Sequence, residues 1–185
     1  QGKLGEAAAP LKALLASEGS EAGNTFMQMN ALLAKQSDKV GVLQLVRDVA
    51  KGYEKMPESH FAIAQAAGNA KQFDVTKNET IIALKLKPDW EQAALLHSDA
   101  LRQLEGKPAG AMAFLKNFVA ANKGAREARL SLAQLYAVEK NYPAARAEFE
   151  TIVGNADKNP DLMVAIALLL YQNGDNEGAE KYFKQ

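Results

Sequence analysis

The two histidines, His60 and His97, are the side chains best suited to acid–base or metal chemistry in this sequence, which contains no cysteine. They do not form a His-Glu-x-x-His motif, whose two histidines bind zinc from one face of a helix. The run His97-Ser98-Asp99 has the residue types of a catalytic triad. Consecutive residues on a helix point about 100° apart, however, and cannot form the hydrogen-bonded relay. We therefore predict no catalytic residue and no metal site.

A second candidate for ion binding is the segment Asn173-x-Asp175-x-Glu177-Gly178, which has oxygen ligands and a sixth-position glycine like a calcium loop. Such a loop needs a bidentate glutamate at its twelfth position, and here the twelfth residue is Lys184. The sequence also lacks the glycine-rich motifs that bind nucleotide phosphates. We interpret the segment as a turn between helices, and we predict a protein that is not an enzyme and uses no cofactor.

The overall composition excludes further classes. The chain of 185 residues has 22 basic and 22 acidic side chains, so its formal net charge is zero. Nucleic-acid-binding domains usually carry a basic stripe, so we expect no nucleic-acid partner. The longest apolar run, residues 162–171, is half the length of a membrane-spanning helix of about 20 residues, so we predict no transmembrane segment. Because the chain begins with Gln1, we expect it to be a processed form or part of a longer protein.

The elements that position any site are predicted to be helices throughout. Alanine and leucine, both strong helix formers, occur 34 and 22 times. Turn-forming residues separate helical patterns near residues 68–72, 106–108, 140–143 and 173–176. The result is a series of short helices joined in pairs. Pro10 falls inside the first predicted helix, which we expect to start late, kink or fray there.

Three sets of positions repeat along the chain with the same period. In the first set the steps are 34, 34, 35 and 34, and in the other two they are 34, 35, 34 and 34. The one extra residue falls between Ser98 and Ala111. Small residues at these positions allow two helices to approach closely, and larger ones fill the space beside the next pair. The three sets are Asn30, Ala64, Ser98, Ala133 and Ala167; Val42, Thr76, Ala111, Ala145 and Ala179; and Val46, Thr80, Leu115, Phe149 and Phe183.

This pattern resembles the tetratricopeptide repeat (TPR) family, a helix–turn–helix repeat of 34 residues. The resemblance is best in residues 126–159, where the signature positions hold Leu132, Ala133, Tyr136, Tyr142, Ala145 and Phe149. Residues 57–90 also carry it, through Ile63, Ala64, Phe73, Ala83 and Lys87-Pro88-Asp89. The sequence departs from the family in two ways. Asn30 and Thr76 stand where the family prefers glycine or alanine, and His60 and Arg129 replace a bulky aromatic residue.

The resemblance implies an all-α, right-handed α-α superhelix, or solenoid, of about five helix pairs plus one leading helix. We predict a single solenoid domain over residues 1–185, with pairs at about 23–56, 57–90, 91–125, 126–159 and 160–185. In the family, the first helix of each pair lines a concave groove. The corresponding partner-binding residues here would be Phe61, Gln65, Asn69, Leu95, Asp99, Arg102, Gln103, Leu130, Gln134 and Tyr171.

These residues favour a non-enzymatic scaffold that binds a peptide segment or a folded partner protein. Amide side chains donate and accept hydrogen bonds, so they suit the backbone of an extended peptide. Recognition of an acidic chaperone tail is not supported, since only Lys35 and Arg102 are basic among the groove positions. The alternative is a structural or oligomerisation module that self-associates through its apolar C-terminal end. The segments 60–65 and 86–90 resemble Ala/Leu-rich repeat proteins of Gram-negative bacteria, which hints at a periplasmic or envelope location over a cytoplasmic one.

Overall fold

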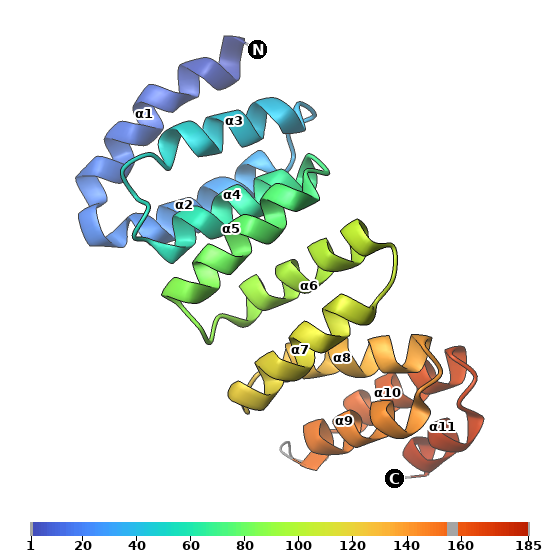
Figure 1. Cartoon of the computed structure of the whole chain (residues 1–185). Coiled ribbons are helices and arrows are strands. Elements are labelled where there is room, and N and C mark those ends of the chain that lie inside the picture. The colour runs from blue at the N-terminus through green and yellow to red at the C-terminus, as the bar shows by residue number, and fades with distance from the viewer. Residues whose placement is uncertain (1, 155–158, 185) are drawn as a thin grey trace. The chain divides into compact units, whose positions relative to one another are not determined.

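The computed structural model describes residues 2–154 and 159–184, and in these ranges the secondary structure is entirely helical (Figure 1). The predicted fold class is confirmed: in the described ranges a leading helix is followed by ten further α-helices of the α-solenoid type. The helices are α1 (Gly2–Glu18), a short 3-10 helix (Gly19–Glu21), α2 (Ala22–Leu33), α3 (Lys39–Val49), α4 (Pro57–Asn69), α5 (Phe73–Leu86), α6 (Glu91–Glu105), α7 (Ala109–Ala121), α8 (Arg126–Val138), α9 (Tyr142–Gly154), α10 (Pro160–Gln172) and α11 (Asn176–Phe183).

The chain divides into two compact units, an N-terminal unit of residues 1–106 and a C-terminal unit of residues 107–185. The boundary lies between Gly106 and Lys107, inside the stretch from Ser98 to Ala111 in which the repeat gains its one extra residue. The interruption of the period and the division of the fold therefore coincide in sequence. The prediction of one solenoid domain over the whole chain stays a prediction.

In the N-terminal unit, α1 packs against α3, α2 and α3 pack against α4, and α4 and α6 pack against α5. The core combines aliphatic side chains with Phe26 and with the small residues Ala62, Ala66 and Ala67 of α4. Of the three outcomes expected at Pro10, the late start does not occur: α1 begins at Gly2 and continues through Pro10. Pro10 is exposed, and apolar residues on both sides of it pack onto the core, which holds the helix in place despite the lost hydrogen bond.

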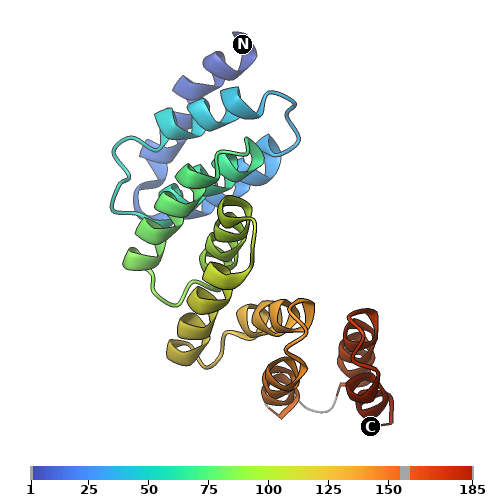
Figure 2. The ribbon, with the colours of Figure 1, turned by 45° about the vertical axis from the view of Figure 1, so that its right-hand side comes forward.

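The C-terminal unit packs α7 on α8, α8 on α9, and α10 on α11, with further contacts between α9 and α10 (Figure 2). Alanines occupy the close approaches between its helices, and all of Ala133, Ala145 and Ala167 are fully buried. Phe149 is also fully buried and meets the ring of Tyr182 edge to face, with ring centroids 6.5 Å apart. The alanine positions in the repeat thus do what the sequence predicts, because a methyl group is small enough to let two helices nest.

The turns inside three of the pairs share one backbone conformation. Lys71 lies in the turn between α4 and α5 with φ of 58°, and Lys140 has φ of 60° between α8 and α9. Gly174, at the corresponding place between α10 and α11, has φ of 91°. This left-handed region suits glycine and costs other residues about 1–2 kcal/mol. Two lysines therefore carry backbone strain at a position where the last pair uses glycine.

Candidate partner-binding surfaces

The N-terminal unit contains a cavity of about 580 Å³ between the first helices of its pairs. A second cavity of about 420 Å³ adjoins it, since both are lined by Met27, Gln65, Leu96 and Asp99. The larger cavity is also lined by Asn30, Ala31, Ala34, Gly68, Asn69, Phe73, Thr76 and Ala100, and the smaller one by Phe61, Gln92 and Leu95. The helices α2, α4 and α6 supply most of these residues, as the resemblance implies for a concave face.

The floor of the larger cavity is polar and internally hydrogen-bonded. Asn30 is 7% exposed, and its side-chain nitrogen donates to the backbone oxygen of Ala62 at 2.9 Å and to Oε1 of Gln65 at 2.7 Å. The hydroxyl of Thr76 donates to the backbone oxygen of Ala64 at 3.2 Å. Gln65 is thereby held by its oxygen, which leaves its amide nitrogen as a donor for a partner molecule.

Five of the predicted groove residues line these two cavities, but they do so in different ways. Gln65, Asn69 and Asp99 contribute polar groups to the larger cavity, and Leu95 contributes an apolar wall to the smaller one. Phe61 is only 3% exposed, because its ring packs on Trp90 with centroids 4.5 Å apart. Phe61 therefore forms part of the buried wall of the smaller cavity and offers little exposed surface to a partner.

Arg102 and Gln103 lie farther along α6, where neither lines either cavity. The guanidinium of Arg102 is 3.5 Å from Oδ1 of Asp99, and both side chains are about half exposed. An exposed pair of this kind contributes little to stability. The part of Arg102 and Gln103 in partner binding stays a prediction.

The predicted groove residues of the C-terminal unit lie on α8 and α10. Gln134 and Tyr171 are exposed, whereas Leu130 is half-buried and packs against the core. Two exposed apolar residues were missed: Val138, 60% exposed, and Leu168, 46% exposed. Both occupy groove positions in the same register. Leu168 lies within the apolar run 162–171, which by composition alone is read as core.

The two histidines of the N-terminal unit, of which His60 departs from the family pattern, are buried and paired. Nδ1 of His60 lies 2.7 Å from Oε2 of Glu79, and Nε2 lies 2.9 Å from the backbone oxygen of Glu54. Nδ1 of His97 lies 2.8 Å from the hydroxyl of Thr80. Burial lowers the pKa of His97. Both histidines thus hold neighbouring helices together, and no group of three or more potential metal ligands occurs in residues 2–154 and 159–184.

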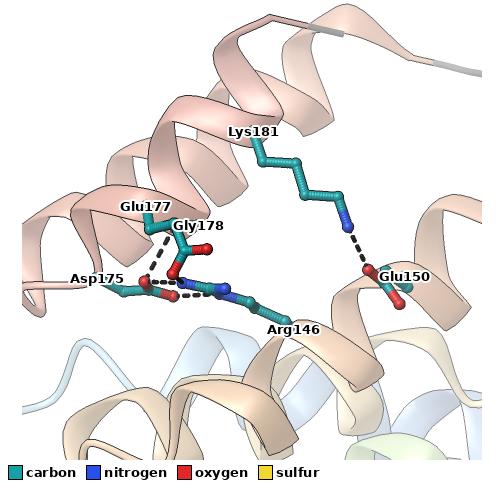
Figure 3. Close-up of polar contacts among 6 residues, drawn as sticks. All are labelled: Arg146, Glu150, Asp175, Glu177, Gly178 and Lys181. Carbon is teal, nitrogen blue, oxygen red and sulfur yellow. Dashed lines mark hydrogen bonds and ion pairs between the residues drawn. The ribbon is translucent and has the colours of Figure 1, made fainter.

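In the C-terminal unit, charged side chains join α9 to the turn before α11 (Figure 3). Nε of Arg146 donates to Oδ2 of Asp175 at 2.7 Å, and its Nη2 pairs with Oδ1. The backbone nitrogen of Gly178 also donates to Asp175, at 3.0 Å. These contacts hold the pKa of the Asp175 carboxyl below its usual range and raise the pKa of Arg146. Both oxygens of Asp175 therefore accept hydrogen bonds from Arg146 or Gly178. In the segment that looks like a calcium loop, this carboxylate thus joins α9 to the turn before α11.

The geometry defines the class of protein: an α-helical repeat protein built from antiparallel helix pairs. Residues 102–162 match the tetratricopeptide repeat family. No protein with curated annotation matches the sequence. The match covers about a third of the chain, and over these residues the sequence is similar to the tetratricopeptide repeat, a helix–turn–helix fold.

Solved structures support that fold over most of the chain. MamA from Desulfovibrio magneticus RS-1 has 15% sequence identity and a TM-score of 0.60, with 88% of this chain and 91% of MamA covered. The thermophilic TPR protein TTC0263 from Thermus thermophilus has 16% identity and a TM-score of 0.62, with 88% of each chain covered. YrrB, described as a TPR protein with an unusual peptide-binding site, has 15% identity, a TM-score of 0.57, and coverage of 92% of this chain and 88% of its own.

No helix in the described part of the chain is long and apolar enough to cross a membrane.

Proposed function

We propose that this protein is a non-enzymatic interaction scaffold that binds an extended peptide segment of a partner protein. The observation that carries the proposal is the pair of adjoining cavities in the N-terminal unit, with amide side chains on the floor and walls. The larger cavity, about 580 Å³, falls within the range of natural ligand sites. The solved neighbour YrrB, whose description names a peptide-binding site, supports the proposal.

The amide groups explain why an extended peptide fits best. An extended backbone presents one donor and one acceptor per residue, and these groups must be paired when they leave water. Asn69 offers a donor and an acceptor at the edge of the cavities, and Gln65 and Gln92 offer their side-chain nitrogens as donors, since their oxygens accept from Asn30 and Trp90. Met27 and Leu95 provide apolar surface for the side chains of the peptide. A partner would therefore be held by its backbone and selected by its apolar side chains.

The proposal is tested with a random peptide library displayed on phage and selected against the full chain. The binding of the selected peptide is then measured by fluorescence anisotropy for the wild type and for Gln65→Ala, Asn69→Ala and Asp99→Ala. We expect the affinity to fall about tenfold for Gln65→Ala, since removal of its side-chain amide would leave a backbone group of the peptide unpaired. Gln44→Ala is the matched control, because Gln44 is exposed on the second helix of a pair.

Unchanged affinity in all three cavity variants would exclude this surface as the peptide site. Asn69 is exposed, so its replacement tests the cavity without disturbing the core. Gln65 accepts a bond from Asn30, so the folding of Gln65→Ala is checked by its thermal unfolding curve. A folded variant with wild-type affinity counts against the proposal.

The second candidate function, self-association through the C-terminal end, has one observation in its favour: Phe183 is 53% exposed. Its neighbour Tyr182 is buried against Phe149, and the remaining exposed side chains of α11 are polar. The helix therefore presents a mainly polar surface, which favours the scaffold function. Light scattering on the wild type and Phe183→Ser distinguishes the two, since a monomer at all concentrations excludes self-association.

A further inference from the structure

The C-terminal unit exposes a row of apolar side chains along α10. Val164 is 45% exposed, Leu168 46% and Tyr171 62%. They are spaced four and three residues apart, so they lie on one face of the helix. On α8, which shares a core cluster with α10, Val138 is 60% exposed and Leu130 is half-buried. Together these five residues form what we name the apolar face.

Two carboxylates stand at the beginning of this face. Glu127 lies in the first turn of α8 and Asp161 in the first turn of α10, at equivalent positions of the repeat, and both are exposed. Neither takes part in an ion pair within residues 2–154 and 159–184. An apolar surface with unpaired acids at one end is complementary to a partner that carries apolar side chains and a basic end.

The polarity of the face decides the conformation of that partner. The uncharged polar side chains of the apolar face are Gln134 and Gln172. They are too few to pair the backbone of an extended peptide. Backbone groups left unpaired on an apolar surface cost free energy. A helix satisfies its own backbone hydrogen bonds, and its side chains pack into those of another helix as ridges into grooves. The apolar face therefore suits a helix, in contrast to the amide-lined cavities of the N-terminal unit.

We infer that the C-terminal unit docks an amphipathic helix of a partner protein, with its apolar stripe on Val164, Leu168 and Tyr171 and its basic residues at Glu127 and Asp161. The inference rests on the proposed function, because it also treats the first helices as the binding surface, and it adds the class of partner. A second copy of this chain is less suitable. Its equivalent face has two acids and no lysine or arginine, so an isologous contact lacks the complementary charge.

The test uses the full chain and a synthetic peptide of about 20 residues, long enough to form a helix. The peptide has leucines on one helical face and lysines at one end, and a second peptide replaces every lysine with glutamate. Binding is followed by fluorescence anisotropy. We expect saturable binding of the lysine peptide and affinity roughly tenfold or more lower for the glutamate peptide. We also expect Asp161→Asn to weaken binding and to reduce its dependence on salt.

Leu168→Ser is the decisive variant, because Leu168 is exposed and its replacement leaves the core intact. It should lower the affinity for the lysine peptide about tenfold. Phe183→Ser, which removes an exposed apolar side chain outside the face, should leave the affinity unchanged. Equal binding of both peptides, or wild-type affinity in Leu168→Ser, overturns the inference. So does dimerisation of the full chain, detected by light scattering and abolished by Leu168→Ser, because the occupant is then a second copy.

The variants of the N-terminal cavities separate this inference from the proposed function. Asn69→Ala should weaken the peptide selected by phage display and leave the binding of the lysine helix unchanged. Leu168→Ser should do the reverse. If the helix binds and no extended peptide does, the cavity proposal fails and the docking of a helix stands. If the extended peptide binds and the helix does not, the inference fails alone.

Discussion

The two units occupy the same repeat positions with side chains of different polarity. Among the close-approach positions of the N-terminal unit, Asn30, Thr76 and Ser98 are polar and buried, whereas Ala64 and Val42 are apolar. The C-terminal unit has alanine at each of these places, with Phe149 fully buried one turn on. One unit therefore joins its helices partly through hydrogen bonds inside the core, and the other through apolar packing and ion pairs. The repeat requires a small side chain that fits, and it accepts a polar one wherever the neighbouring helix offers a partner.

This difference extends to the surfaces. The buried amide of Asn30 holds Gln65 at the cavity of the N-terminal unit, so the polar core and the polar binding surface are connected. In the C-terminal unit the first helix α10 is apolar on its buried and its exposed sides. If both proposals hold, the unit with the polar core binds an extended peptide and the unit with the apolar core binds a helix. Four sets of substitutions test the comparison, from the largest expected effect to the smallest.

Truncation of the central aromatic side chain should have the largest effect on the C-terminal unit. Phe149→Ala removes a fully buried ring and should lower the free energy of unfolding by about 3–5 kcal/mol. Urea denaturation followed by circular dichroism measures the change. Gln134→Ala, on an exposed position, is the control and should stay within about 0.5 kcal/mol of the wild type. Similar losses for both variants would show that the repeat register is wrong.

Loss of the buried ion pair should come next. Asp175 is 3% exposed, so Arg146→Ala leaves a buried carboxylate without its cation and should cost about 3 kcal/mol. The folded-state pKa of Asp175 is lowered from its usual 3.8 by Arg146. The stabilisation is therefore fully present above the unfolded pKa and is lost as the pH falls through the lower, folded one.

Denaturation of Arg146→Ala and wild type at neutral and strongly acidic pH tests both expectations. Lys181→Ala breaks the exposed pair with Glu150, in which both side chains are about half exposed, and should cost less than about 1 kcal/mol. A difference between wild type and Arg146→Ala that persists unchanged at the lowest pH would refute the ion-pair explanation.

The polar core of the N-terminal unit should show a smaller effect. Thr80 is fully buried, and its hydroxyl lies 2.8 Å from Nδ1 of His97. Thr80→Val keeps the shape and removes this hydrogen bond, at a cost of about 1–2 kcal/mol in chemical denaturation. Thr151→Val is the matched control on an exposed position. A neutral result at Thr80 would mean that the hydrogen bonds in this core add no stability over apolar packing.

The strained turns should show the smallest effect, with the opposite sign. Lys140→Gly and Lys71→Gly relieve a left-handed backbone and should raise stability by up to about 1 kcal/mol. The gain is limited because glycine also increases the entropy of the unfolded chain. Thermal unfolding of each single variant measures it. Lys123→Gly, a lysine outside the positive-φ positions, should not stabilise the protein, and equal gains at all three sites would contradict the strain explanation.

Much of the architecture was predictable because it follows from local rules. The 34-residue period identified the close-approach positions, and Ala64, Ala133 and Ala167 are all fully buried. The predicted turns near residues 106 and 173 contain glycines with positive φ. Pro10 shows the limit of these rules, since packing on both sides of it keeps α1 helical. Phe183, predicted to fill the space beside a following pair, is exposed because no such pair packs on it within residues 159–184.

The sequence predicted which repeat positions form the candidate site, but it did not predict the contacts or the exposure of the side chains there. Position in the repeat selected Gln65, Asn69, Leu95 and Asp99, which line the cavities of the N-terminal unit. The same register could not show that Phe61 is covered by Trp90, since their contact joins residues 29 positions apart (90 − 61). The register does place Leu168 at a groove position, but the apolar composition of residues 162–171 gives no sign that Leu168 is exposed while Leu170 is buried.

The sequence alone therefore determined the helices, their pairing and the positions at which they approach, because each depends on side chains repeated at a regular spacing. The tertiary structure decided which polar residues are paired and which are free for a partner. His60 and Asp175 are candidates for chemistry in the sequence, and each is held by a side chain from another helix. The physical reason is that a hydrogen bond or an ion pair depends on the distance between two atoms, and residues far apart in the chain acquire that distance only when helices pack.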